Sequence, residues 1–316
     1  MKSKLLFITT SLLFFFCACT PEKEPEIIEL SVSERAITVQ PEGGSHKIAV
    51  SCNVDWQAEF DYNDYNWCAV DATQANGDTI YIEVSRTESE QPRETRIIVQ
   101  NSNAASRTIV SDTITVTQAG WTVPEEGVLI NGTIWARYNV ETFGTFTESP
   151  LEAGKLYQFN NATAYTITDT DGLLAVEPNW NPVSFTDIWL PENNPCPAGW
   201  RIPTQEEVFA LVKSGYKYDS TPNGFFFGRN SQTATIEEPN GCIFLPAGGF
   251  IENGEVVDIL QTGRYWVKTG CAVGDNSVFY RYLNFYNEDL GNDLAELAYI
   301  ATHDINYAFS IRCVKE

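Results

Sequence analysis

The residues of this 316-residue chain best suited to special chemistry are its eight cysteines and two histidines. His46 lies beside a predicted strand and His303 in a predicted loop, and nothing places either imidazole next to a nucleophile. The chain lacks Gly-x-Ser-x-Gly, a phosphate-binding loop, His-Glu-x-x-His and any Cys-x-x-Cys pair. We therefore predict no catalytic residue, no structural zinc site and no cofactor. A pair of glycosidase carboxylates stays open, because spacing along the chain does not show separation in space.

The first two cysteines belong to an export signal. Lys2 and Lys4 precede the apolar run 5–16, which is too short to span a bilayer as a helix and is followed by "FCAC". This ending resembles a bacterial lipobox, which implies a signal peptide over residues 1–18, lipidation of Cys19 and a solvated tether over residues 19–26. The alternative is an ordinary signal peptide with a fortuitous cysteine. The following "PEKEPE" resembles the export signal of Bacteroidetes surface lipoproteins, so we expect a lipid-anchored outer-membrane protein that faces outward.

The charge of the chain limits its partners. It has 42 acidic against 20 basic residues and a formal net charge of −22. Nucleic acids and anionic lipid headgroups need clustered lysine and arginine, so we predict no nucleic-acid partner and membrane attachment through lipid alone. Such acidity suits a soluble surface and equally a calcium-binding extracellular protein, and composition does not separate the two.

Alternating apolar residues indicate strands in the first part of the chain. The stretch 48–60 has an apolar residue at every second position, which predicts one half-buried strand. Similar short runs and turn clusters continue to Gly120 without a helical run, which predicts an antiparallel β-sandwich. The segments "SCNVDWQAEF", "NWCAVD", "GDTIYIEV", "RETRIIV" and "TITVTQAG" resemble the BACON domain of Bacteroidetes surface proteins over residues 27–120. The resemblance implies an Ig-like sandwich that binds carbohydrate or acts as a spacer.

Residues 121–316 have a different sequence pattern. "CPAGWRIPT", "LPAGG" and "IRCV" resemble the Fibrobacter succinogenes major paralogous domain, which implies an α+β fold related to C-type lectins and a role in adhesion. Within it, Thr204 and Glu207 form the pattern of a capping box, and Gly215 is placed to end the resulting short helix. We thus expect a mainly β protein, an Ig-like antiparallel β-sandwich followed by a C-type-lectin-like domain.

Six further cysteines in an exported chain favour disulfides. A bridge between Cys196, just before the helix, and Cys313, in the predicted last strand, would close the second domain, and the lectin-like resemblance points the same way. By exclusion Cys242 would pair with Cys271. In the sandwich Cys52 and Cys68 share the inward face and form a bridge or remain two buried thiols.

Candidate ligand-binding residues lie in the second domain. Glu238-Pro239-Asn240 is the tripeptide with which calcium-dependent lectins hold calcium and sugar, because carboxylate and amide oxygens suit calcium and a cis-proline can aim both. A Trp-Asn-Asp partner is absent, so a solvated turn is the alternative, and calcium is the only cofactor that we consider. Trp180 and Trp189 lie in the irregular stretch 177–194 and could stack on sugar rings or pack under a loop.

These observations predict a cell-surface lipoprotein for adhesion or glycan binding. The sandwich would be the spacer and the lectin-like domain the recognition module, with a glycan or a host or bacterial surface protein as partner. One alternative is a subunit or tip of a fimbria-like assembly. The other is a carbohydrate-active enzyme.

Overall fold

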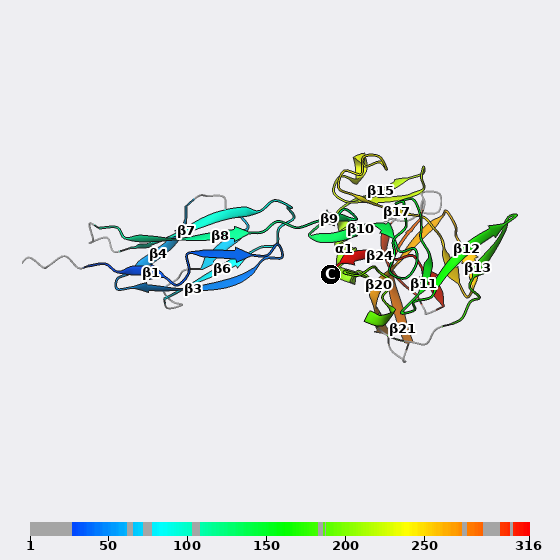
Figure 1. Cartoon of the computed structure of the whole chain (residues 1–316), viewed down its shortest axis with the longest axis horizontal. Coiled ribbons are helices and arrows are strands. Elements are labelled where there is room, and N and C mark those ends of the chain that lie inside the picture. The colour runs from blue at the N-terminus through cyan, green and yellow to red at the C-terminus, as the bar shows by residue number, and fades with distance from the viewer. Residues whose placement is uncertain are drawn as a thin grey trace, which may run out of the picture.

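The computed structural model describes residues 27–61, 66–71, 78–102, 108–182, 186, 188–273, 277–286, 298–303 and 306–316. The structure is 51% strand and 6% helical, so the prediction of a mainly β protein is confirmed. Its strands form several sheets, nearly all of them antiparallel, in two units that lie end to end (Figure 1). In the described part of the chain, no helix has the length and apolar character needed to cross a bilayer.

In the part of the first unit that the structure describes, the strands form two four-stranded sheets. One has the order β1-β3-β6-β5, with bounds Leu30–Val32, Gly44–Cys52, Thr79–Val84 and Cys68–Asp71. The other has the order β2-β8-β7-β4, with bounds Ala36–Val39, Ser111–Gln118, Arg93–Asn101 and Trp56–Phe60. All neighbours pair antiparallel except β2 and β8. The inward side chains of both sheets share one core, which includes Ile48, Ile80, Ile97, Ile114 and Val116.

The predicted single strand over residues 48–60 is wrong. The chain forms β3 up to Cys52, turns, and begins β4 at Trp56 in the opposite sheet. Asn53 holds this turn, because its Nδ2 donates to the carbonyl of Ile27 and its Oδ1 accepts from the amide of Glu29. The apolar alternation continues through the turn because both strands face the same core.

The described residues of the second unit form four sheets. The sheet β14-β24-β10-β9 has the bounds Trp200–Arg201, Arg312–Lys315, Thr133–Asn139 and Gly127–Ile130. The six-stranded sheet β13-β12-β11-β23-β18-β19 has the bounds Leu173–Glu177, Ala164–Thr170, Leu156–Gln158, Tyr307–Phe309, Phe250–Glu252 and Glu255–Val257. The sheet β15-β16-β17 has the bounds Tyr216–Asp219, Gly224–Phe227 and Ile243–Pro246. The sheet β20-β21-β22 has the bounds Thr262–Val273, Ser277–Tyr286 and Ala298–His303.

The helix α1, Gln205–Lys213, confirms the predicted capping box. The Thr204 hydroxyl accepts from the amide of Glu207, whose carboxylate accepts from the amide of Thr204 at 2.8 Å. Gly215 follows the helix with a φ of 106°, a left-handed conformation that glycine adopts without steric cost. Buried Val208 and Leu211 attach α1 to the core shared with β20, β21 and β22. Short 3-10 helices occur at Pro191–Asn193 and Ser231–Thr233.

A small set of polar and aromatic contacts joins the two units. The Trp121 Nε1 donates to the carbonyl of Thr87 at 2.7 Å, and Arg86 lies over the Trp121 ring at 5.2 Å. The Arg86 guanidinium also donates to the carbonyl of Gly132. Glu88 and Arg229 form an exposed ion pair of 2.9 Å across the junction.

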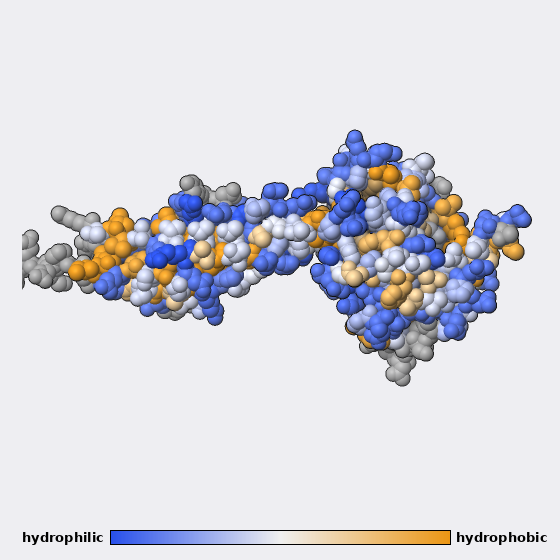
Figure 2. All heavy atoms as spheres, in the orientation of Figure 1, coloured by the Kyte–Doolittle hydropathy of each residue, from blue (hydrophilic) through white to orange (hydrophobic). Residues whose placement is uncertain are grey.

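The visible face of the first unit mixes hydrophobic with hydrophilic residues (Figure 2).

Candidate functional site

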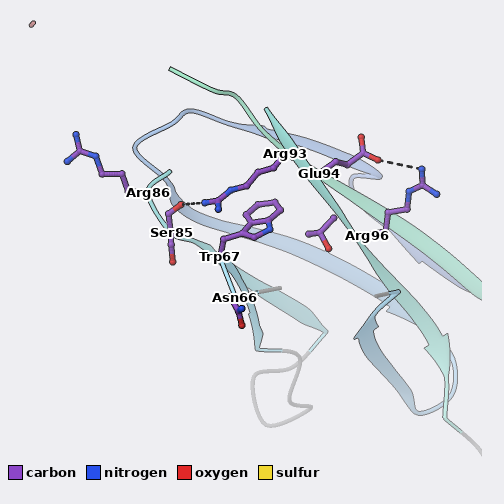
Figure 3. A pocket seen from close by; sticks show the side chains of 8 residues that line it. Asn66, Trp67, Ser85, Arg86, Arg93, Glu94 and Arg96 are labelled. Atoms are coloured by element: carbon purple, nitrogen blue, oxygen red, sulfur yellow. Dashed lines mark hydrogen bonds and ion pairs between the residues drawn. The ribbon is translucent and has the colours of Figure 1, made fainter. Parts of the chain in front are cut away.

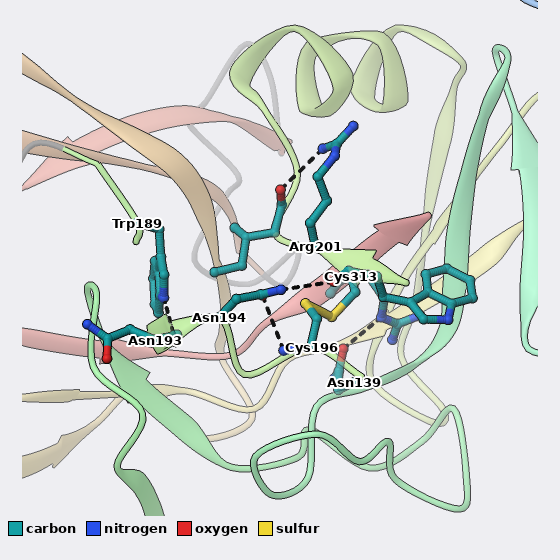
Figure 4. The surroundings of a disulfide bond; sticks show 10 residues. Asn139, Trp189, Asn193, Asn194, Cys196, Arg201 and Cys313 are labelled. Carbon is teal, nitrogen blue, oxygen red and sulfur yellow. Dashed lines mark hydrogen bonds between the residues drawn. A yellow bond between two sulfur atoms is a disulfide. The ribbon is translucent and has the colours of Figure 1, made fainter. Parts of the chain in front are cut away.

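The disulfide between Cys196 and Cys313 is present, as predicted. The two Cα atoms are 6.1 Å apart, and the bond joins the segment before α1 to β24 (Figure 4). Asn194 positions this segment, because its Oδ1 accepts from the Cys196 amide and its Nδ2 donates to the carbonyl of Trp200. Both cysteines are buried in the core. The bond is therefore a structural closure of the second unit.

The predicted bridge between Cys52 and Cys68 is wrong, because both are free cysteines. Cys68 pairs in register with Val84, whose other neighbour is Gly44 at the start of β3, whereas Cys52 is the last residue of β3. Gly44, which is level with Cys68, lies eight residues along β3 from Cys52, a distance of about 26 Å. A disulfide cannot span this distance. Both thiols lie at the core as small apolar groups, and burial raises the pKa of Cys68 to about 11.

The predicted pairing of Cys242 with Cys271 is also wrong. Cys242 is free and buried, and it packs with Phe226 and Phe244. Burial raises the pKa of its thiol. The backbone of Cys271 lies in β20 opposite Phe279, and its side chain lies outside the described part of the structure.

The two predicted tryptophans have different surroundings. Trp189 is only 3% exposed, its ring packs against Phe159, and its Nε1 donates to the carbonyl of Asn193 at 2.8 Å. It is a core residue and has no face to offer to a sugar, which corrects the ligand-binding prediction. Trp180 is half-buried and its ring centroid lies 5.1 Å from that of Tyr165. No other predicted ligand residue lies in the apolar cluster that it joins.

Glu238 and Asn240 lie in a turn, as the alternative to the calcium prediction expects. Glu177-Pro178 is the cis peptide bond found in the described residues, so Glu238-Pro239 is trans and does not aim both side chains at one point. The Asn240 amide instead donates to the carbonyl of Thr233, and Glu238 is exposed in a turn closed by Thr235. Within the described residues, no three of the His, Cys, Asp and Glu side chains gather as metal ligands would. Cys19 and its tether lie outside the described residues.

A groove lies in the first unit, at the end of the sandwich that meets the second unit. It has a volume of about 780 Å³ and opens between the start of β5, the end of β6 and the start of β7. Its lining residues are mostly polar, and they comprise Asn66, Trp67, Ser85, Arg86, Arg93, Glu94, Thr95 and Arg96. Figure 3 shows Trp67 at its centre. None of the predicted ligand-binding residues lines it.

Arg93 and Trp67 form the fixed part of this groove. The Arg93 guanidinium lies 4.4 Å from the centroid of the Trp67 ring, a cation–π contact (Figure 3). Its Nε donates to Gln118 Oε1 at 2.8 Å and its Nη2 to the carbonyl of Ser85 at 3.2 Å. Desolvation lowers the pKa of Arg93, and nearby Cys68 opposes this shift. The stack therefore presents a positioned cation beside an indole ring.

The other charged side chains of the groove are less constrained. Arg96 and Glu94 form an ion pair of 3.5 Å with side chains that are 54% and 49% exposed. Such exposed pairs hold their partners weakly. Arg86 points away from Trp67 in Figure 3, since its guanidinium contacts Gly132 and Trp121 at the junction. Arg93 and the exposed part of Trp67 form one side of the groove, and Arg96 lies on the opposite, exposed face of β7.

The sequence did contain a signal for this site. Three arginines fall within the eleven residues 86–96, in a chain with more than twice as many acidic as basic residues. Trp67 lies in "NWCAVD" and Arg96 in "RETRIIV", two segments that served only to establish a resemblance, because their spacing does not show that the starts of β5 and β7 are close. The packing of one sheet on the other supplies this proximity.

No curated protein sequence matches the chain. Among solved structures, a Bacteroides thetaiotaomicron protein determined by NMR is 15% identical, with a TM-score of 0.24, over 32% of this chain and 95% of its own. A Bacteroides ovatus GH5 xyloglucanase, in complex with a XXXG heptasaccharide, is 18% identical, with a TM-score of 0.25, over 49% of this chain. The chain spans 32% of the length of that enzyme.

A family model matches part of the first unit. Residues 57–119 fit the model described as "BACON: Putative binding domain, N-terminal". Every residue that lines the groove falls inside this segment. The match thus confirms the BACON resemblance for the part of the chain that carries the candidate site.

Proposed function

We propose that this protein is a lipid-anchored surface protein that binds glycans without catalysis, through the groove around Trp67. The observation that carries the proposal is the position of the groove, which lies wholly inside the segment that matches a binding domain. An indole ring next to guanidinium and hydroxyl donors suits a sugar, which has apolar C–H faces and polar rims. Recognition would then belong to the sandwich, in place of the spacer role expected from the sequence.

The groove favours binding over hydrolysis. Glycoside hydrolysis needs two carboxyl groups on either side of the scissile bond. Among the described residues, Glu94 is the one carboxylate that lines the groove, and it is paired with Arg96. No described lining residue carries an imidazole that could act as a general base.

The second unit has a supporting role in this proposal. Its predicted ligand residues do not converge, since Trp189 is buried and Asn240 is engaged with the backbone. We propose a C-type-lectin-like fold for residues 121–316 and an Ig-like fold for the sandwich. The disulfide between the segment before α1 and the last strand supports the first of these. Cys19 would carry the lipid that holds the chain at the outer membrane.

The assembly alternative is favoured by one observation. The hairpin of β12 and β13 extends from the second unit at the end away from the first unit (Figure 1). Leu173 and Leu174, at the start of β13 next to the hairpin turn, are 74% and 43% exposed. If this hairpin mediates assembly, replacing both leucines with lysine should reduce self-association in light-scattering measurements.

A glycan array with the purified mature protein tests the proposed function. We expect binding that is lost in Trp67→Ala and retained in Trp180→Ala, a matched aromatic change in the second unit. Because Trp67 also touches the core, Ser85→Trp provides a second variant, since it fills the groove from an exposed position. Unchanged binding in Ser85→Trp would locate the site elsewhere, and a mature protein that binds no glycan would refute the function.

A further inference from the structure

The groove has a local charge opposite to that of the chain. The whole protein carries a net charge of −22, yet three arginines and one glutamate line the groove. Arg86 is engaged at the junction, which leaves Arg93 and Arg96 against Glu94. The acidic surface of the chain repels a negative ligand, whereas the arginines of the groove attract it, so charge favours binding at the groove.

Arg93 is held in place without an acidic partner. Gln118, which is 0% exposed, accepts from the Arg93 Nε and donates through its own Nε2 to the carbonyls of Pro41 and Ser85. In the described part of the chain no carboxylate pairs with Arg93. Its remaining N–H donors can therefore meet a ligand without breaking an ion pair, and its orientation costs little entropy on binding.

Arg96 supplies a second, adjustable cation. Its present partner Glu94 is about half exposed and lies at 3.5 Å, longer than a strong charge-assisted hydrogen bond. A ligand carboxylate could replace that weak contact. Planar guanidinium groups match carboxylates through paired N–H donors, whereas a neutral hydroxyl gains much less from them.

We infer that the ligand of this groove is an acidic glycan, one whose sugar rings carry carboxylates, as uronic acids do. This inference rests on the proposed glycan-binding function and names its ligand class. The carboxylate of one sugar would accept from Arg93, while the apolar face of that sugar ring would lie against the exposed part of Trp67. Arg96 leaves the opposite face of β7 and would donate to the carboxylate of another sugar of the same chain. A polymer of such sugars would place further charges along the opening of the groove.

Calorimetric titration with polygalacturonate oligosaccharides tests the inference. The same oligosaccharides with methyl-esterified carboxyl groups serve as a neutral match of equal length. We expect the acidic form to bind roughly 10- to 100-fold more tightly, as charged hydrogen bonds require. Its affinity should fall as salt rises from low to high concentration, because salt screens exposed charges.

Two variants locate the effect. Arg96→Gln, at an exposed position, should weaken binding of the acidic form about tenfold with no change in melting temperature. Arg93→Lys keeps the charge but loses the planar fork, and should also weaken it. Arg35→Gln is the control, since it removes one arginine from the same unit outside the groove. Equal losses in Arg35→Gln and Arg96→Gln would overturn the inference.

The outcomes separate this inference from the proposed function. Equal binding of the acidic and esterified forms would overturn the acidic class and leave glycan binding intact. Binding of neither form, together with an empty glycan array, would refute both. Polyglutamate that binds as tightly as the acidic sugar and competes with it would show an anionic peptide site, and would overturn the glycan assignment.

Discussion

Replacing both Cys196 and Cys313 with alanine should strongly destabilise the second unit and leave the first unit nearly unchanged. The disulfide closes a loop with a sequence separation of 117. The chain-entropy model assigns a loop of this length a stabilisation of roughly 5 kcal/mol. Domains of this size unfold with about 5–15 kcal/mol, so the loss would take a large share of the stability of the unit. The first unit contains no part of this loop.

Guanidinium chloride unfolding, followed by hydrogen exchange on separate peptides, measures both units at once. The fall in free energy of unfolding follows from the shift in midpoint at constant slope. Peptides of β24 report on the second unit and peptides of β7 on the first. The parent protein under reductant should reproduce the double variant, because both lack the bond. Cys242→Ala, which removes a buried thiol that forms no bridge, controls for the lost sulfur volume.

Two results would contradict this expectation. A loss below about 1 kcal/mol in β24 would mean that the unfolded chain gains little freedom when the bond is absent. An equal loss of protection in β7 would mean that the two units unfold as one body. In that case the few contacts of Arg86 and Trp121 at the junction would be enough to make the two units unfold cooperatively.

Three further changes have definite expected results. Glu207 is paired with Arg201 at 2.7 Å and, although burial opposes it, hydrogen bonds lower its pKa from 4.5. The stabilisation from the ionised Glu207 is therefore complete above pH 4.5 and is lost as the pH falls through the lowered pKa. Glu207→Gln should lower the free energy of unfolding by about 1 kcal/mol at pH 7. The difference in melting temperature between this variant and the parent protein should shrink in acid. Arg312 is 1% exposed and donates to Asn139 and to backbone carbonyls, so Arg312→Met should cost more than about 3 kcal/mol in denaturant unfolding. Cys19→Ala should release the protein from membranes in fractionation, and a variant that stays membrane-bound would refute lipidation.

Local features of the fold could be predicted because neighbours along the chain decide them. The capping box of Thr204 and Glu207 needs only residues three positions apart, and the structure forms both of its hydrogen bonds. Apolar alternation located β3, β6 and β8 for the same reason. The Cys196–Cys313 bond was predictable across a long separation because one cysteine precedes the only clear helix signal and the other lies in the last predicted strand.

Features that depend on strand order could not be predicted. Cys52 and Cys68 both face the core, as the alternation indicates, but register places them at opposite ends of one sheet. The turn between β3 and β4 could not be predicted either, because the alternation of apolar residues in β3 continues without a break in β4. Trp189 lies in an irregular stretch of sequence, which is common for binding residues. In the structure its backbone amide donates to the carbonyl of Lys268, and its ring lies in the core.

The position of the groove is compatible with both roles that the BACON resemblance implies for the sandwich, carbohydrate binding and that of a spacer. The chain enters the sandwich at β1, where Leu30 lies opposite Cys52, whereas Trp67 and Ser85 lie at the Gly44 end of the same sheet. These ends are about 26 Å apart along β3. If Cys19 carries the lipid, the body of the sandwich holds its own groove away from the membrane. The sandwich is then a spacer for the site that it contains, and the second unit lies next to the groove through the contacts of Arg86 with Gly132 and Trp121.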